Sequence, residues 1–166
     1  QLAEAGATVV LAQFGQMESL AGPDGLPAFL AAYEKLIAEF QGGSAGTPAR
    51  RVILLEPVAF EPSNLSHGPD LALHNFSQTA YTAAIRELAK RLELPFVPLT
   101  YWEATPRLAE NGFQLSEEGH RIVATRITEG LGLAPKPDSG LAAVHREVLE
   151  LERLWFDYWR PMNWSF

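Results

Sequence analysis

The chain has 166 residues, of which 47% are hydrophobic, and its formal net charge at pH 7 is −7. The length fits one globular domain with a real hydrophobic core, and the acidic balance argues against nucleic acid, whose phosphates require clusters of Lys and Arg. The sequence contains no cysteine, which excludes a thiol nucleophile, a disulfide framework and cysteine-ligated zinc.

Neither a membrane span nor a secretion signal is indicated by the sequence. No apolar run approaches the roughly 20 residues of a membrane-spanning helix, and no charged segment followed by an apolar one opens the chain. The lack of cysteine does not fix the compartment, so bacterial cytoplasmic and extracytoplasmic locations both stay open. The chain begins at Gln1 and not at Met, and we expect that it is cut from a longer protein.

The first part of the chain predicts one strand followed by one helix. Residues 7–13 form a continuous apolar, partly β-branched run, typical of a strand covered on both faces of a parallel sheet. Gly15 then permits a sharp turn. A helix is expected from about Pro27 to Phe40, with Pro27 in its first turn and apolar side chains along one side. Residues 41–48 are rich in Gly and Ser, which favours a surface return.

A second strand-helix unit and a third strand follow. Residues 51–56 predict a buried strand that ends at Pro57. The connection over residues 60–70 is long, and long connections are more often functional than tight ones. A helix is expected up to about Leu92, and residues 94–99 predict a short third strand between prolines.

Three further helices are predicted in the last third of the chain. Thr100 to Glu103 resembles a capping box that opens a short helix. Ser116 can cap a helix from about Glu117 to Leu131, whose first turn carries carboxylates. After a Pro-containing linker at 134–138, a last helix shows an apolar stripe of Val144, Val148, Leu151, Trp155 and Tyr158.

Alternating strands and helices predict an α/β fold with helices on both faces of a parallel sheet. An apolar first strand at a sheet edge would be an aggregation hazard, so we expect that strands N-terminal to Gln1 are missing. The expected organisation is an α/β domain in residues 1–133, and a linker with an amphipathic helix in residues 134–166 that continues toward a missing region.

The loop at 109–120 resembles the last motif of the SGNH (GDSL-type) hydrolases, in which an Asp and a His three residues apart complete a Ser-His-Asp site. Here Asn111 stands at the Asp position and Gln114 at the His position. The segment at 14–19 resembles the third motif, Gly-x-Asn-Asp/Glu, with Gly15 and Glu18 matching and Met17 in place of the oxyanion-hole Asn. The resemblance covers residues 7–131 and implies a three-layer, flavodoxin-like sandwich whose first strand, carrying the nucleophile, is not in this chain.

The replacements remove the chemistry that the resemblance implies. A general base needs a pKa near the working pH, and the Gln114 carboxamide has none, so it can hold a hydrogen bond but cannot relay a proton. The Met17 thioether cannot donate a hydrogen bond to an oxyanion. No serine lies in a nucleophile elbow.

Other polar and aromatic side chains are candidates for a binding crevice at the carboxyl ends of the strands. They are Gln16, Glu18, Glu56, Tyr101, Trp102 and His120. A metal site is not expected; the weak alternative combines His67, Asp70 and His74. No cofactor is expected.

The sequence therefore favours a fragment of an SGNH-like esterase domain, a class that acts on ester or acetyl groups, that is inactive as it stands. The alternative is a non-catalytic module on the same fold that binds carbohydrate or peptide. A small ester or a carbohydrate is the expected partner under these hypotheses, and the oligomeric state stays open.

Overall fold

The computed structural model describes residues 2, 6–42, 49–62, 71–99, 107–133 and 141–159. The chain divides into two compact units, Gln1–Leu133 and Ala134–Phe166.

Three parallel strands form the sheet of the first unit. They are β1 (Val9–Ala12), β2 (Arg51–Leu55) and β3 (Phe96–Val97), in the spatial order β1-β2-β3. Residues pair in register from Val9 with Arg51 to Ala12 with Leu54, and from Leu54 with Phe96 to Leu55 with Val97. The three predicted strands are confirmed, although β3 is shorter than expected because prolines flank it and cannot donate ladder hydrogen bonds.

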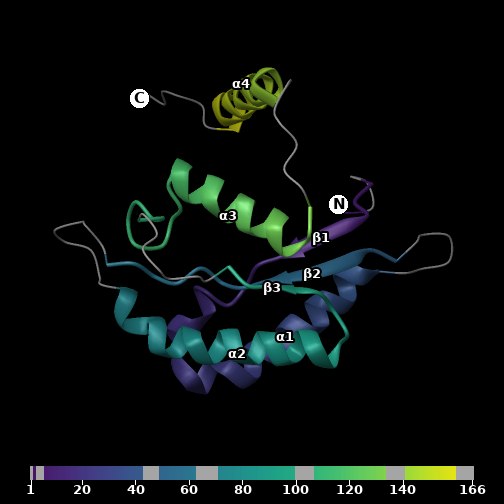
Figure 1. The fold of residues 1–166 in the computed structure, drawn as a ribbon, viewed down its shortest axis with the longest axis vertical. Coiled ribbons are helices and arrows are strands. Elements are labelled where there is room, and N and C mark those ends of the chain that lie inside the picture. Colours follow the sequence, from purple (N-terminus) through teal and green to yellow (C-terminus); the bar gives the residue numbers. More distant parts are fainter. Residues whose placement is uncertain are drawn as a thin grey trace, which may run out of the picture. The chain divides into compact units, whose positions relative to one another are not determined.

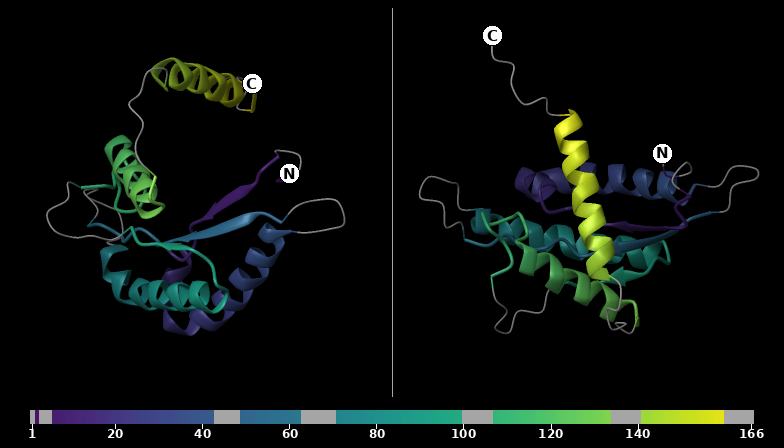
Figure 2. Two further views of the ribbon diagram at one scale, coloured as in Figure 1. Left: turned by 45° about the vertical axis from the view of Figure 1, so that its right-hand side comes forward. Right: turned by 90° about the horizontal axis from the view of Figure 1, so that it is seen from above.

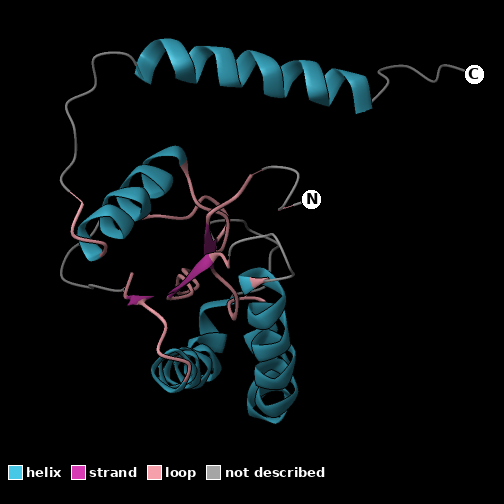
Figure 3. Ribbon diagram, turned by 90° about the vertical axis from the view of Figure 1, so that its right-hand side faces the viewer, coloured by secondary structure: helices cyan, strands magenta, loops and turns pink. Residues whose placement is uncertain are grey.

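Helices cover the sheet on both faces, which confirms the predicted α/β fold. Helix α1 (Gly22–Gln41) and helix α2 (Asn75–Arg91) lie on one face, and α3 (Glu117–Gly130) lies on the other. Figure 2 and Figure 3 turn the view of Figure 1 and show the same arrangement: the strands lie between the pair α1 and α2 on one side and α3 on the other. Two single-turn 3₁₀ helices, η1 (Glu18–Ala21) and η2 (Leu71–His74), precede α1 and α2.

The side chains of β2 alternate between two hydrophobic clusters. Val52 and Leu54 point into the cluster that includes residues of α1 and α2, while Leu55 and Ile53 belong to the cluster with α3. Each strand residue points to the opposite face from its neighbour, so one apolar strand serves both layers. Each helix of this unit packs apolar side chains toward the sheet: Tyr33 and Ile37 of α1, Tyr81, Ile85 and Leu88 of α2, and Ile122, Val123 and Ile127 of α3.

Helix α1 begins earlier than predicted. It starts at Gly22 and places Pro23 in the first turn, where a missing N–H needs no partner, so the expected start near Pro27 is wrong. Pro27 lies inside the helix, in its second turn, where its missing N–H removes one helical hydrogen bond.

Strand β1 is covered on one face only among the described residues. Ala12 is buried and Val10 packs against the same cluster, whereas Val9 and Leu11 are each 47% exposed. The prediction of burial on both faces is wrong here, because the cluster under α3 is built on β2 and β3 and does not reach β1.

The capping of α3 is confirmed, since the Ser116 hydroxyl accepts a hydrogen bond from the Gly119 N–H at 3.0 Å. The predicted capping box from Thr100 to Glu103 lies outside the described residues. The second unit contains α4 (Leu141–Trp159). Within the described part of the chain, no helix is both long and apolar enough to cross a membrane.

Two buried tyrosines predict a loss of stability at alkaline pH. The Tyr33 hydroxyl donates to the Ala12 carbonyl at 3.1 Å, and the Tyr81 hydroxyl donates to the Gly22 carbonyl at 3.0 Å. Burial raises the pKa of both phenols, and the negative charge of the nearby Glu18 carboxylate raises it further by a smaller amount. Because the folded-state pKa is above the unfolded value of about 10, their contribution is present below pH 10 and is lost as pH rises further.

We therefore expect the free energy of unfolding in urea to fall above about pH 10 by up to roughly 1.4 kcal/mol per pH unit for each tyrosine. Tyr33→Phe should flatten this decline while costing about 1 kcal/mol at pH 7 from the lost hydrogen bond. Equal alkaline profiles for Tyr33→Phe and the unmodified chain would contradict the assignment.

Candidate functional site

The carboxyl ends of the parallel strands lie at one edge of the sheet, where open α/β folds carry their working side chains. The chain leaves β1 through residues 13–17 and leaves β2 through residues 56–62. The loop at 107–116 precedes α3 and contains the second group of predicted site positions.

The turn after β1 is built around Gly15. Its φ is +107°, and a Cβ at this position would lie 2.7 Å from Cδ1 of Ile85, so conformation and packing both require glycine. The Glu18 carboxylate accepts a hydrogen bond from the Gly15 N–H at 2.8 Å. Glu18 therefore fixes the turn, and its side chain is directed at the backbone of its own loop.

Two glutamines connect this turn to the segment after β2. The Gln13 side-chain N–H donates to the Glu56 carbonyl at 3.1 Å, and that of Gln16 donates to the Val58 carbonyl at 2.8 Å. Met17, which follows, is 49% exposed. The thioether at this position offers no hydrogen-bond donor to a developing oxyanion.

Asn111 shapes the loop before α3 and contacts Gln114. Its side-chain oxygen accepts from the Gln114 N–H at 2.9 Å and from the Phe113 N–H at 3.3 Å, the hydrogen bonding of an Asx-turn. The Asn111 side-chain N–H donates to the Gln114 side-chain oxygen at 3.4 Å. The two positions that the family resemblance assigns to an acid and a base are thus in contact as a pair of carboxamides.

The loop after β1 and the loop before α3 meet at a small cavity. Its volume is about 100 Å³, and it is lined by Gln13, Phe14, Gln16, Val58, Phe113 and Leu115. The two neighbours of Gly15 and the two neighbours of Gln114 therefore line one space. The fold brings part of the loop after β1 and part of the loop before α3 to the same cavity.

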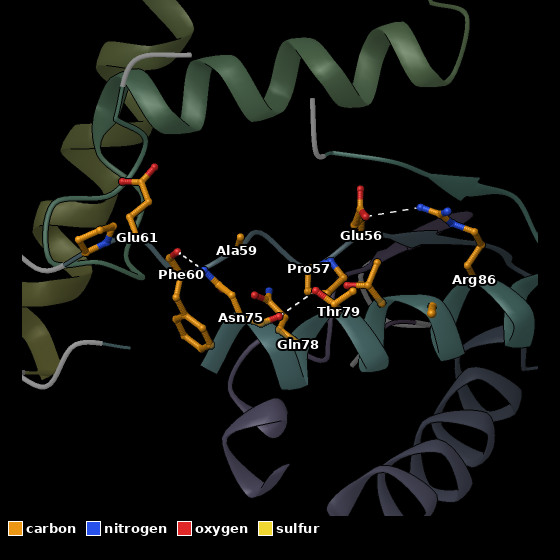
Figure 4. A pocket seen from close by; sticks show the side chains of 12 residues that line it. Glu56, Pro57, Ala59, Phe60, Glu61, Asn75, Gln78, Thr79 and Arg86 are labelled. Atoms are coloured by element: carbon orange, nitrogen blue, oxygen red, sulfur yellow. Dashed lines mark hydrogen bonds and ion pairs between the residues drawn. The ribbon is translucent and has the colours of Figure 1, made fainter. Parts of the chain in front are cut away.

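Glu56 lies at a different hollow. Its carboxylate is 5% exposed, accepts from the Leu99 N–H at 2.8 Å and lies 3.6 Å from the Arg86 guanidinium. Figure 4 shows Glu56 and Arg86 at one end of this hollow, whose volume is about 630 Å³, between the segment after β2 and α2. At its other end, Asn75 and Phe60 form a reciprocal pair of hydrogen bonds at 2.8 and 2.9 Å.

Polar groups lining the larger hollow already hydrogen-bond within α2 or from α2 to the segment after β2. The Gln78 side-chain N–H donates to the Val58 carbonyl at 2.7 Å, and the Thr79 hydroxyl donates to the Asn75 carbonyl at 2.8 Å. Because these groups already have protein partners, a ligand in this hollow would compete with existing hydrogen bonds.

The remaining predicted residues have no shared centre in the described structure. His120 is exposed on α3. Tyr101 and Trp102 lie outside the described residues, as do His67 and Asp70 of the metal alternative. Among the residues that the structure does describe, no group of three or more His, Asp or Glu side chains could hold a metal ion.

Sequence reasoning missed Glu61, which anchors the loop before α3. Its carboxylate oxygens accept from the Leu108 N–H at 2.8 Å and the Ala109 N–H at 2.9 Å, and its own N–H donates to the Gly112 carbonyl at 2.8 Å. Arg107 lies 3.6 Å from the same carboxylate. A lone Glu between Phe and Pro in a long loop gives no periodic signal, so no sequence pattern could have indicated this role.

The loop is also pinned at its junction with α3. A Cβ on Gly119 would lie 2.1 Å from the Leu108 carbonyl oxygen, and that carbonyl accepts from the Ser116 N–H at 2.8 Å. Only glycine allows this approach of helix and loop.

Removing one acceptor oxygen from Glu61 should destabilise the fold. In Glu61→Gln an NH₂ group faces one of two backbone N–H groups, so one buried donor loses its partner, at a cost of about 1–3 kcal/mol. The measurement is the free energy of unfolding in urea. Glu110 is exposed in the same loop, and Glu110→Gln is the matched control, expected to change stability by less than about 0.5 kcal/mol. Equal values for the two variants would show that Glu61 does not anchor the loop.

No protein-family model matches the sequence, and no curated protein sequence matches it either. Solved structures do resemble the fold. The native aryl esterase of M. smegmatis matches with a TM-score of 0.59 at 15% sequence identity, over 74% of this chain and 59% of the esterase. A carbohydrate acetylesterase from Sinorhizobium meliloti matches with a TM-score of 0.60 at 17% identity, over 79% of this chain and 64% of that one.

The chain thus spans less than two thirds of the length of either esterase. At these identities the likeness concerns the fold alone. With its parallel sheet between two helical layers, this chain has an SGNH-hydrolase-like α/β fold.

Proposed function

We propose that residues 1–133 form the carboxyl-terminal part of an SGNH (GDSL-type) esterase domain, acting in its intact form on ester or acetyl groups, and that this chain does not itself catalyse hydrolysis. The observation that carries the proposal is the contact between Asn111 and Gln114, next to the cavity shared with the turn after β1. The two matched structures are esterases, one of them a carbohydrate acetylesterase, and this supports ester hydrolysis as the activity of the intact domain.

The proton chemistry supports inactivity. Acyl transfer by a serine requires a base that accepts the hydroxyl proton and an acid that returns it to the leaving group. Asn111 and Gln114 contact each other at 3.4 Å, but neither carboxamide titrates, so the pair cannot relay a proton. Losing the base costs on the order of 10⁶-fold in turnover, about 8 kcal/mol of transition-state stabilisation.

The oxyanion position supports the same conclusion independently. Met17 follows the Gly15 turn where the resemblance places a donor, and its sulfur can only accept weakly. Loss of one such donor typically costs about 2.7–4 kcal/mol. Restoring a base alone would therefore leave a second defect.

Hydrolysis of 4-nitrophenyl acetate tests the inactivity. We expect the chain to release nitrophenol no faster than the heat-denatured chain at the same concentration. We also expect no covalent labelling by a fluorophosphonate, since no serine is activated by a base. Turnover or labelling that disappears with a single Ser→Ala substitution would contradict the proposal.

A second candidate function is a non-catalytic module that binds carbohydrate or peptide at the same loops. It is favoured by Phe113, which is 39% exposed, lines the small cavity and belongs to the same loop as Asn111 and Gln114. An aromatic face beside carboxamide groups suits a sugar ring, whose carbons pack on the aromatic face while its hydroxyls hydrogen-bond to the amides.

Titration calorimetry with short, partly acetylated oligosaccharides tests this candidate. If the loop binds sugar, Phe113→Ala should weaken binding by at least tenfold, whereas the neighbouring control Glu110→Gln should not. Equal affinity with and without Phe113→Ala, or no binding at millimolar sugar, would contradict this second function.

A further inference from the structure

We propose that α4 joins two copies of this chain through an antiparallel two-helix coiled coil. The proposal concerns the second unit alone and is independent of the proposed function of residues 1–133. It rests on the spacing, exposure, size and charge of the side chains of α4.

Five apolar residues of α4 follow a seven-residue repeat, whereas Leu149, Leu154 and Phe156 lie outside it. The steps between the five alternate between four and three residues, which is the pattern of a coiled-coil seam. The seam positions and their exposed fractions are Val144 (59%), Val148 (45%), Leu151 (55%), Trp155 (54%) and Tyr158 (73%). With 19 residues, α4 is about 28 Å long, enough for these five positions to face one partner helix.

No charged side chain occupies a seam position of α4. Arg146 and Arg153 occupy the position of the repeat farthest from the seam, and the Arg153 guanidinium pairs with the Glu150 carboxylate at 2.9 Å. The seam itself is therefore apolar, with charged side chains on its flanks and behind it.

Side-chain size favours an antiparallel partner. With the two-fold axis midway along the helix, Val148 lies opposite Leu151 of the second copy, and Val144 lies opposite Trp155, so each layer combines a smaller side chain with a larger one. In a parallel pair in register, Trp155 of one helix would lie opposite Trp155 of the other, and Val144 opposite Val144. The layer with two indoles would be too crowded, and the layer with two valines would leave a void.

Charge favours the same orientation. In a parallel pair, Glu147 of one helix flanks Glu152 of the other, which places like charges together on both sides of the seam. In the antiparallel pair, Glu152 flanks His145, whose imidazole N–H can donate to the carboxylate. Glu147 then flanks Leu154, so no like-charged pair forms along the seam.

Sedimentation of the full chain at tens of micromolar tests the association. We expect twice the chain mass of 18.3 kDa. Leu151→Asp should return the mass to one chain, since it places a charge in the seam. Leu149 has nearly the same exposure, 51%, but lies off the seam, so Leu149→Asp is the matched control and should remain a dimer.

Circular dichroism of both variants should show unchanged helix content, so that a lost dimer is not a lost helix. A single-chain mass for the unmodified protein would overturn the proposal and leave the seam to a different partner. A dimer that survives Leu151→Asp, or that is lost equally in Leu149→Asp, would overturn it by placing the contact elsewhere.

The absence of native cysteine makes the orientation measurable by disulfide formation. Under mild oxidation, Val144→Cys chains should not cross-link with each other but should cross-link with Trp155→Cys chains, because these positions lie opposite only in the antiparallel pair. Efficient cross-linking of Val144→Cys with itself would show a parallel pair and overturn the orientation.

Discussion

The fold of the first unit depends on the burial of β2 from both sides. Successive residues of this strand point to opposite faces, with Val52 and Leu54 toward α1 and α2, and Ile53 and Leu55 toward the layer of α3. Because neighbouring strands run parallel to β2, each must be reached by a crossover, and the crossovers supply the helices that cover the sheet. The same constraint brings the segments after β1 and β2 to one edge, where Gln13 and Gln16 join them.

In the candidate site, the residues that hold the loops in place differ from the residues at the positions assigned to catalysis. The loops are held by Gly15 with Glu18, and by Glu61 with the backbone of Leu108 and Ala109. None of these contacts needs a proton to move. Under the function proposed here, the positions assigned to proton transfer and oxyanion stabilisation hold two carboxamides and a thioether, which cannot supply that chemistry.

Much of the fold could be predicted from the sequence, because periodicity reports burial directly. Apolar runs located the three strands, and the Ser116 cap located the start of α3. Two errors have physical causes. Two prolines lie in the first turns of α1, and sequence alone did not show that the helix begins before Pro23 and includes Pro27. Burial of β1 on both faces was inferred from its composition, but an apolar strand has the same composition whether or not a helix covers it.

Site positions could be named from the sequence only where a segment resembled a known motif. Gly15, Asn111 and Gln114 came from the family resemblance, and residues of their loops line one cavity. Glu61 and the tight contact at Gly119 did not, since both depend on which backbone lies opposite in space. Glu56 was placed correctly at the end of β2, yet its partners Leu99 and Arg86 come from distant parts of the chain.

The turn at Asn111 has a consequence for how such a domain changes over time. Its side-chain oxygen caps two backbone N–H groups, and a carboxylate oxygen of Asp would accept the same two hydrogen bonds. An Asp at this position would lose only the 3.4 Å bond to the Gln114 side chain, so the backbone of the turn accepts either residue. Under the proposed function, a single amide-to-acid exchange here would restore one titrating group without reshaping the loop.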